Sequence, residues 1–219
     1  MPSTEPVVER AVRERPILFS GPMVRAILED RKTQTRRVMK PLKHPEWTGY
    51  MMAREGYAIE CGPDYPDDEQ DKVRCPYGVA GDRLWVRETL RPSQSGIVTY
   101  GEDGCPAWRQ GESVSWPWSK TPKVRTAIFM PRWASRILLE LIEVRAQRLQ
   151  EISEQDAIAE GMHRFGSTQI WGHDPKGTRG YLAEYSAKDA YRLLWDQING
   201  KRHPWSNNPW IWAITFKRI

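Results

Sequence analysis

The chain has 219 residues, with 33 Lys and Arg against 28 Asp and Glu, a net charge of +5 and a pI near 9.1. This length suits one well-packed domain with long loops, and the charge favours anionic partners without reaching the density of a dedicated nucleic-acid-binding arm. No apolar run approaches the roughly 20 residues that span a bilayer, and the N-terminus lacks a signal peptide's apolar segment, so we expect a cytoplasmic protein with no membrane partner.

Residues 1–14 are charged and show no periodicity, so we interpret them as a mobile arm. A short buried strand is expected over Ile17–Phe19. Gly21 and Pro22 are typical of a helix start, and apolar residues follow at helical spacing, at Met23, Val24, Ile27 and Leu28. This helix is expected to fray near residues 30–32, and residues 35–39 (TRRVM) then read as extended.

Three irregular segments, at about residues 40–80, 91–126 and 162–185, are interpreted as insertions in a single domain over residues 15–219. The first contains a possible short strand at residues 57–60. The insertions therefore add loops and short strands without adding a second domain.

Between the first two insertions, residues 81–90 (GDRLWVRETL) alternate as a strand after a Gly-Asp turn. Leu84, Val86 and Glu88 fall on one face, and Trp85 falls on the other. Glu88 is then buried and needs a cationic partner, for which Arg36 and Arg37 are the candidates.

The second half of the chain offers three more strands and two capped helices. Residues 127–130 read as a strand, and after a turn at Pro131 a long strand is expected over Arg136–Arg148, where a helix remains an alternative. Two Ser-x-x-Asp capping boxes, at Ser153 and Ser186, predict helices that end near Gly161 and Gly200. Residues 208–219 (NPWIWAITFKRI) close the chain as a strand.

Short strands dominate this pattern, and no regular strand-helix alternation that would build a parallel sheet is present. The expected fold class is therefore α+β, with a small mixed β-barrel and peripheral helices.

The aromatic and cysteine content sets further limits. Eleven Trp and 17 Pro indicate a packed core with fixed loops, because disordered chains are poor in aromatic residues. Cys61, Cys75 and Cys105 form no C-x-x-C pair, and an odd number makes a poor disulfide framework. A zinc site with His44 or His163 lacks the closely spaced ligand pairs that such sites use. We predict no metal and no cofactor.

The most unusual cluster is residues 29–40 (EDRKTQTRRVMK), where five cations surround two threonines. Clustered cations and hydroxyls bind phosphate, and a desolvated lysine such as Lys32 can act as a base for a hydroxyl such as that of Thr35. A solvated charged face is the more common explanation for such a run. Glu160, at a helix C-terminus, opposes the helix dipole and is either a proton donor or an exposed solubilising residue. Trp85 can stack on a nucleobase, although a tryptophan on a strand is more often part of the core.

Four segments of the chain together resemble the ASCH-domain family, in particular its longer members from phages and prophages. These segments cover under half of the chain and are RPILFSGPMVRAILEDRKTQTRRVMKP, GDRLWVRE, FMPRWASRILLELIEVRAQRLQEISEQDAIAEG and NPWIWAITFKRI.

The resemblance implies a PUA-like β-barrel with a cleft, and some small family members look like amidohydrolases that deacylate N4-acetylcytidine. Their G-x-K-T-x-T-x-R motif maps onto this chain with Lys32, Thr35 and Arg37 at its functional positions and Asp30 in place of the glycine, and their glutamate maps onto Glu160. Lys32 is then expected to take a proton from Thr35, which attacks the amide, while Glu160 protonates the leaving amine.

Three hypotheses follow from the sequence. The first is an amidohydrolase acting on an N4-acylated cytidine or a related modified base in RNA or DNA, with Lys32, Thr35 and Glu160 as catalytic residues. Arg36, Arg37, Trp85 and Glu88 are the expected substrate-binding residues. The alternatives are a non-catalytic RNA- or DNA-binding module and a ribonuclease.

Overall fold

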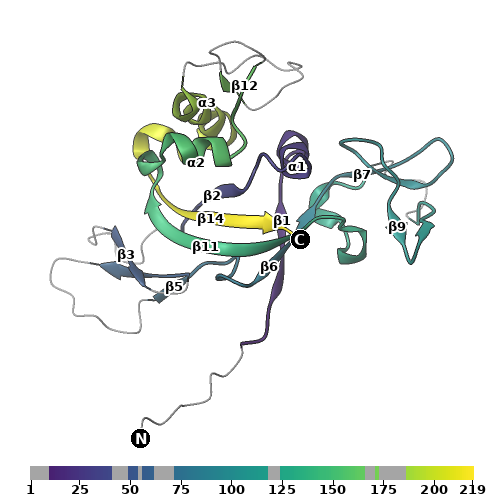
Figure 1. Cartoon of the computed structure of the whole chain (residues 1–219), viewed down its shortest axis with the longest axis horizontal. Coiled ribbons are helices and arrows are strands. Elements are labelled where there is room, and N and C mark those ends of the chain that lie inside the picture. Colours follow the sequence, from purple (N-terminus) through teal and green to yellow (C-terminus); the bar gives the residue numbers. More distant parts are fainter. Residues whose placement is uncertain are drawn as a thin grey trace, which may run out of the picture.

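The centre of the protein is a curved five-stranded sheet in the order β1-β6-β11-β14-β2 (Figure 1). The computed structural model describes residues 10–40, 49–53, 56–61, 72–117, 124–165, 171–172 and 186–219. The strands are β1 (Glu14–Leu18), β6 (Arg83–Arg87), β11 (Leu138–Arg148), β14 (Trp210–Arg218) and β2 (Gln34–Val38). Strands β1 and β6 are parallel, and the other neighbours are antiparallel. The mixed α+β class is confirmed.

The sheet is open, which differs from the closed barrel expected from the sequence. Barrel closure needs a backbone ladder between the two edge strands, and in the described part of the chain β1 and β2 share no such pairing. A side chain spans this gap instead, because a guanidinium nitrogen of Arg37 on β2 donates to the Leu18 carbonyl oxygen at the end of β1, at 2.6 Å. Helix α1 (Gly21–Leu28) connects the same two edges.

Strand β14 is buried on both faces, and its alternation divides the core in two. Trp212, Ile214 and Phe216 enter the cluster that also holds α1 residues, whereas Ile211 and Ala213 enter the cluster with α2 and α3. A bulge in β11, between Leu141 and Glu143 in the pairing with β14, shifts the alternation by one residue. Buried positions therefore change from 139 and 141 to 144 and 146, and Ile142 is left 46% exposed.

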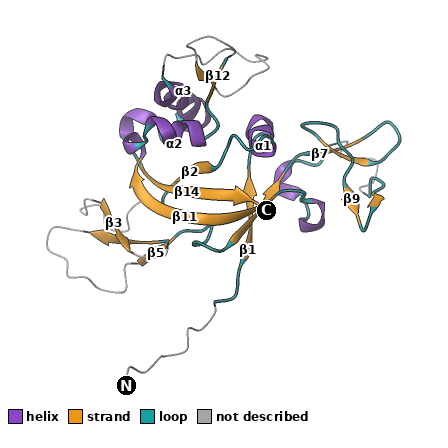
Figure 2. Cartoon of the chain, viewed as in Figure 1, coloured by secondary structure: helices purple, strands orange, loops and turns teal. Residues whose placement is uncertain are grey.

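Helices α2 (Glu154–Ala159) and α3 (Ala187–Asn199) lie together at one end of the sheet (Figures 1 and 2). Both predicted caps are confirmed, since the Ser153 and Ser186 side chains accept from the backbone N–H three residues later. Gly161 has a φ of 103°, a left-handed conformation that glycine adopts at no steric cost. This turn directs the chain away from α2 immediately after Glu160.

The prediction of a strand at residues 127–130 is wrong. Two single-turn 3₁₀ helices, η2 (Ala127–Phe129) and η3 (Arg132–Ala134), flank Pro131 instead. Proline has no N–H for a ladder, and only Met130 of this apolar run is buried, while Ile128 and Phe129 are 57% and 63% exposed. The long strand that follows is confirmed as β11, and the helical alternative is excluded.

The insertions carry short antiparallel strands, most of which had no clear sequence signal. The first holds β3 (Gly49–Ala53), β4 (Tyr57–Cys61) and β5 (Lys72–Arg74), of which only β4 was expected. The second holds β7 (Leu90–Pro92) with β8 (Val98–Tyr100) and β9 (Trp108–Arg109) with β10 (Glu112–Ser113), over a small core of their own. The third holds β12 (His163–Arg164) and β13 (Trp171–Gly172). Two further 3₁₀ turns are η4 (Leu149–Glu151) and η5 (Trp205–Asn207).

The boundary of the N-terminal arm needs correction. Residues 1–9 lie outside the described part of the chain, but Glu14 already begins β1. Arg10 and the backbone N–H of Arg13 donate to Asp82, which is 1% exposed, at 2.8 and 3.0 Å. A buried carboxylate needs such donors, so residues 10–14 belong to the folded domain.

Asp82→Asn is expected to destabilise the protein by about 1–3 kcal/mol at neutral pH, the typical value of hydrogen bonds to a charged group. Burial by itself raises the pKa of Asp82, but the hydrogen bonds from Arg10, Arg13 and Val79 outweigh it and hold the pKa below its ordinary 3.8. A lowered folded-state pKa contributes stability above about pH 4 that is lost as the pH falls through the folded-state value. Urea titrations of both proteins from pH 3 to 7 test this, and a difference that persists unchanged at pH 3 contradicts it.

Candidate functional site

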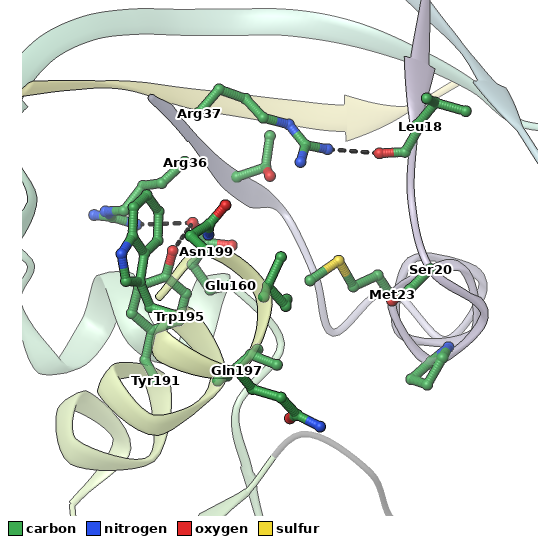
Figure 3. Close-up of a pocket in the computed structure, with 14 residues that line it drawn as sticks. Leu18, Ser20, Met23, Arg36, Arg37, Glu160, Tyr191, Trp195, Gln197 and Asn199 are labelled. Carbon is green, nitrogen blue, oxygen red and sulfur yellow. Dashed lines mark hydrogen bonds and ion pairs between the residues drawn. The ribbon is translucent and has the colours of Figure 1, made fainter. Parts of the chain in front are cut away.

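A cavity of about 420 Å³ opens between β2, the start of α1 and one face of α3 (Figure 3). Its apolar wall includes Leu18, Met23, Leu194, Trp195 and Ile198. Its polar groups come from Ser20, Thr35, Arg36, Arg37, Glu160, Tyr191, Gln197 and Asn199. The cavity thus joins segments that are more than 150 residues apart in the sequence.

The segment that carries Lys32 is held in place by a tight turn after α1. Asp30 has a φ of 55°, the left-handed conformation, and the N–H groups of Arg31 and Lys32 both donate to the Ala26 carbonyl oxygen, at 2.8 and 3.0 Å. Asp is among the few non-glycine residues that are enriched in this conformation. Asp30 thus adopts a backbone conformation that glycine favours.

Lys32 is buried at 2% exposure, and its ammonium group has three acceptors. Nζ donates to the Gln34 carbonyl oxygen and the Glu160 carbonyl oxygen, both at 2.8 Å, and to Glu160 Oε2 at 2.5 Å. An ammonium group has three protons, so these contacts use all of its donors. Within the described chain Lys32 makes no hydrogen bond to Thr35 and does not line the cavity.

Glu160 is the C-cap of α2 and is 4% exposed, so the alternative of an exposed solubilising residue is wrong. Its Oε2 accepts a hydrogen bond from Lys32 Nζ. Its Oε1 accepts hydrogen bonds from Arg36 at 3.2 Å and from the Tyr191 hydroxyl at 3.4 Å (Figure 3). Two cations therefore offset the unfavourable helix dipole at this position. Arg36 also pairs with Asp156 at 3.0 Å.

Burial shifts the proton affinities of two groups in this cluster. It lowers the pKa of Lys32 from its ordinary value, although the neighbouring Glu160 carboxylate acts in the opposite direction. Burial, followed by the charge of Glu160, raises the pKa of Tyr191 well above its ordinary value. Tyr191 therefore remains a protonated donor to Glu160 at neutral pH.

Thr35 and Arg37 are neighbours on the wall of the cavity. Thr35 is 3% exposed, and the Arg37 guanidinium lies over the Phe19 ring at 5.2 Å while it donates to Leu18. In the described structure Arg37 makes no hydrogen bond to Glu160; the arginine that orients this carboxylate is Arg36. Arg36, which was expected to bind substrate, therefore holds the Glu160 carboxylate instead.

Trp85 and Glu88 lie away from this cavity. Trp85 is 8% exposed beneath the guanidinium groups of Arg87 and Arg132. Glu88 is buried as predicted, but its partner is Arg136, which donates to its two oxygens at 2.9 and 2.7 Å, and not Arg36 or Arg37. The partner changes because Arg136 lies two residues before β11, whose first residue, Leu138, pairs with Trp85 on β6.

The sequence analysis did not identify the residues that α3 contributes to the cavity. The apolar spacing of Ala190, Tyr191, Leu194 and Ile198 predicts a buried helix face, and Trp195 and Asn199 had no assigned role. The first three are buried, but Ile198 at the end of this stripe is 53% exposed. The only functional signal of Tyr191 is its hydroxyl group, which needs a hydrogen-bond partner when it is buried.

No group of three or more metal-ligating side chains occurs in the described residues. Cys75 is buried and Cys105 is exposed, and burial raises the pKa of Cys75 to about 11. His44, His173 and the Cys61 side chain lie outside the part that the structure describes. None of the described helices is long and apolar enough to cross a bilayer.

Comparisons of the chain with protein families, with curated proteins and with solved structures found no match.

Proposed function

We propose that this cytoplasmic protein binds an N4-acylated cytosine nucleoside, or the same base within RNA or DNA, and hydrolyses the acyl amide. The observation that carries the proposal is the meeting of Glu160 and Thr35 at one cavity, with Lys32 bonded directly to Glu160. These three residues come from two distant segments of the chain. Nucleophilic amide hydrolysis uses a hydroxyl group and a residue that can carry its proton, and Thr35 and Glu160 supply these two groups to one cavity.

The composition of the cavity suits a planar polar ring. Met23, Leu194 and Trp195 offer apolar surface for the faces of a base, while Gln197 and Asn199 offer amide groups for its edge. Ligand sites commonly combine an apolar lining with a few polar groups that fix the orientation. The volume of about 420 Å³ is sufficient for a nucleoside.

In the proposed reaction, Thr35 Oγ1 attacks the acyl carbon, and Glu160 accepts the hydroxyl proton. Arg37 stabilises the oxyanion of the tetrahedral intermediate. Glu160 then returns the proton to N4 of cytosine, which leaves as the free amine while the acyl group stays on Thr35 as an ester. Water hydrolyses the ester with Glu160 as base, which releases the carboxylic acid and restores the hydroxyl.

This scheme gives Lys32 a different role from the one expected from the sequence. Lys32 can accept a proton from Thr35 only by giving up one of its three hydrogen bonds, two of which go to backbone carbonyls. We assign Lys32 and Arg36 to holding the Glu160 carboxylate in position. Glu160, which faces the cavity, is the proton carrier.

The same proposal places the chain among the ASCH-domain proteins, as a longer member with a PUA-like arrangement. Support comes from the order of the elements, in which the turn at Asp30, strand β2 and the end of α2 surround the residues that match the family motif.

Thr35→Val is expected to lower turnover of N4-acetylcytidine by about 100-fold or more, because it removes the nucleophile and keeps the shape of the side chain. Chromatographic detection of cytidine measures this. The matched control is Thr33→Val, since Thr33 is exposed and lies two residues earlier on the same segment. Failure of the wild-type protein to turn over any of a panel of acylated nucleosides and acylated oligonucleotides would contradict the proposal.

A binding module without chemistry is the second candidate, and the complete set of hydrogen bonds around Lys32 favours it, because a structural ammonium group has this environment. It predicts nucleoside binding by calorimetry that Thr35→Val leaves nearly unchanged. Cleavage of an oligonucleotide by the purified protein, retained in Thr33→Val and lost in Thr35→Val, supports a ribonuclease instead.

A further inference from the structure

Asp156 and Glu160 are four residues apart at the end of the chain that forms α2, and they share one arginine. Arg36 on β2 reaches Glu160 Oε1 through Nη1 at 3.2 Å and Asp156 Oδ2 through Nη2 at 3.0 Å. The Glu160 N–H donates to the Asp156 carbonyl oxygen, so the helical turn places both side chains on one face. The Arg36 side chain is 0% exposed. The two carboxylates are therefore its counter-charges, and water has no access to it.

Asp156 is the member of this network that lies nearest the solvent. Its side chain is 21% exposed, against 3% for Glu160, and its Oδ1 faces Arg145 on β11 at 3.6 Å. Burial by itself raises the pKa of Asp156, but the charge of Arg36 and a hydrogen bond from the Ser153 N–H outweigh it and hold the pKa below its ordinary 3.8. Asp156 is therefore a carboxylate at neutral pH.

Charged and titratable groups surround Glu160 from the segment before β2, from β2, from α2 and from α3: Lys32, Arg36, Arg37, Asp156 and Tyr191. Lys32 and Arg36, whose side chains are both 0% exposed, set two positive charges against the single negative charge of Glu160. Asp156 supplies a second negative charge. The group formed by Lys32, Arg36, Glu160 and Asp156 is thus neutral, and without Asp156 it carries an excess positive charge.

This balance matters for a carboxylate that must both accept and return a proton. Uncompensated cations favour the charged form of a carboxylate and make it a poor base, whereas a second carboxylate nearby favours protonation. Asp156 also competes for Arg36, since its contact is as short as that of Glu160. In the described structure Asp156 does not line the cavity, so it acts on the site through Arg36 and Glu160.

We propose that Asp156 is a positioning residue that keeps Glu160 basic enough to accept the Thr35 proton, by sharing Arg36 with it. The inference rests on the proposed function for its place in the reaction. Its electrostatic part, the effect of Asp156 on the protonation of Glu160, can be measured without turnover. Asp156 itself forms no bond and transfers no proton.

The first measurement is the pH dependence of kcat/KM for N4-acetylcytidine in the wild type and in Asp156→Asn, from about pH 4 to 9. Asparagine removes the charge and keeps an oxygen that can accept from the Ser153 N–H. The acidic limb is expected to move to lower pH by about one unit, because loss of a negative charge favours the charged form of Glu160. At neutral pH kcat/KM is expected to fall by about 3- to 10-fold, since a weaker base accepts the proton less readily.

Asp189→Asn is the matched control. Asp189 occupies the same position in the first turn of α3 that Asp156 occupies in α2, since the N–H of each donates to a capping serine at 3.0 Å. Its side chain is 54% exposed, and it contacts none of the four residues of the neutral group in the described structure. The control therefore removes the same charge from the same kind of cap, and its acidic limb should coincide with that of the wild type.

The second measurement follows Glu160 directly, by NMR of protein labelled with ¹³C at its glutamate carboxyl groups, where Glu160→Gln identifies the signal. The titration midpoint of Glu160 is expected to fall by about one pH unit in Asp156→Asn. A midpoint that rises overturns the proposal, because Asp156 then merely holds Arg36 in place on Glu160, and an unchanged midpoint overturns it as well. Absence of turnover by the wild type contradicts the proposed function alone, and the midpoint still decides the role of Asp156.

Discussion

Lys32→Met is expected to lower the free energy of unfolding by about 3–5 kcal/mol, because it removes one partner of a buried ion pair and leaves the other behind. Lys32 and Glu160 have side-chain exposures of 0% and 3%, so water cannot replace the lost ammonium group. Arg36 then remains as the only cation on this carboxylate in the described structure. Urea unfolding followed by tryptophan fluorescence measures the loss.

The double variant Lys32→Met, Glu160→Gln is expected to recover much of this stability and to have no hydrolytic activity. Replacement of both charges removes the unpaired carboxylate, whose burial is the main cost in the single variant. The control is Lys217→Met, since Lys217 pairs with Glu140 at 3.1 Å but is 57% exposed, and exposed pairs contribute at most about 1 kcal/mol. If the double variant is as unstable as Lys32→Met, the ion pair is not the source of the effect.

The expected loss of stability limits what an activity assay of a Lys32 variant can show. Loss of activity in such a variant does not identify Lys32 as a base, because the same substitution unfolds part of the population and removes a hydrogen-bond donor that holds Glu160. Activity must therefore be compared at matched folded fractions, and Thr35→Val is the cleaner test of the nucleophile.

Arg136→Met is also expected to lower the free energy of unfolding by about 3–5 kcal/mol, because it too leaves a buried carboxylate without its partner. Arg136 donates to both oxygens of Glu88, pairs with Asp103 at 2.6 Å and lies over the Tyr100 ring at 3.9 Å. It therefore joins the second insertion to the central sheet. Its loss leaves Glu88, which is 3% exposed, without its counter-charge.

The pH dependence of this variant provides the check. Burial raises the pKa of Glu88 above its ordinary 4.5, although Arg136 acts against it. A raised folded-state pKa contributes stability at low pH that is lost as the pH rises through the folded-state value. Without Arg136, more stability is lost as the pH rises. The difference in the free energy of unfolding between Arg136→Met and the wild type should therefore narrow as the pH falls toward 5. Arg132→Met, which breaks an exposed pair with Glu14, should cost at most about 1 kcal/mol at any pH.

Local signals in the sequence were sufficient for the main elements. The Pro22 helix start, the capping box at Ser153, the N-cap at Ser186 and the strands β6 and β14 depend on neighbours within a few residues, and all are confirmed. The prediction of a strand at residues 127–130 failed because apolar composition without alternation does not distinguish a strand from exposed 3₁₀ turns.

The sequence by itself determined the α+β class, the burial of Glu88 and the motif residues that became the candidate site, because periodicity, caps and residue order are local properties. Tertiary structure alone decided which charges pair. Lys32 meets Glu160 across 128 positions, and Arg136 rather than Arg36 or Arg37 meets Glu88 across 48. It also decided that residues 29–40 are not one solvated basic run: Lys32 and Arg36 are buried on Glu160, while Arg37 lines the cavity. The physical reason is that a buried ion pair depends on which strands become neighbours in the sheet, and strand order is set by the packing of the whole core.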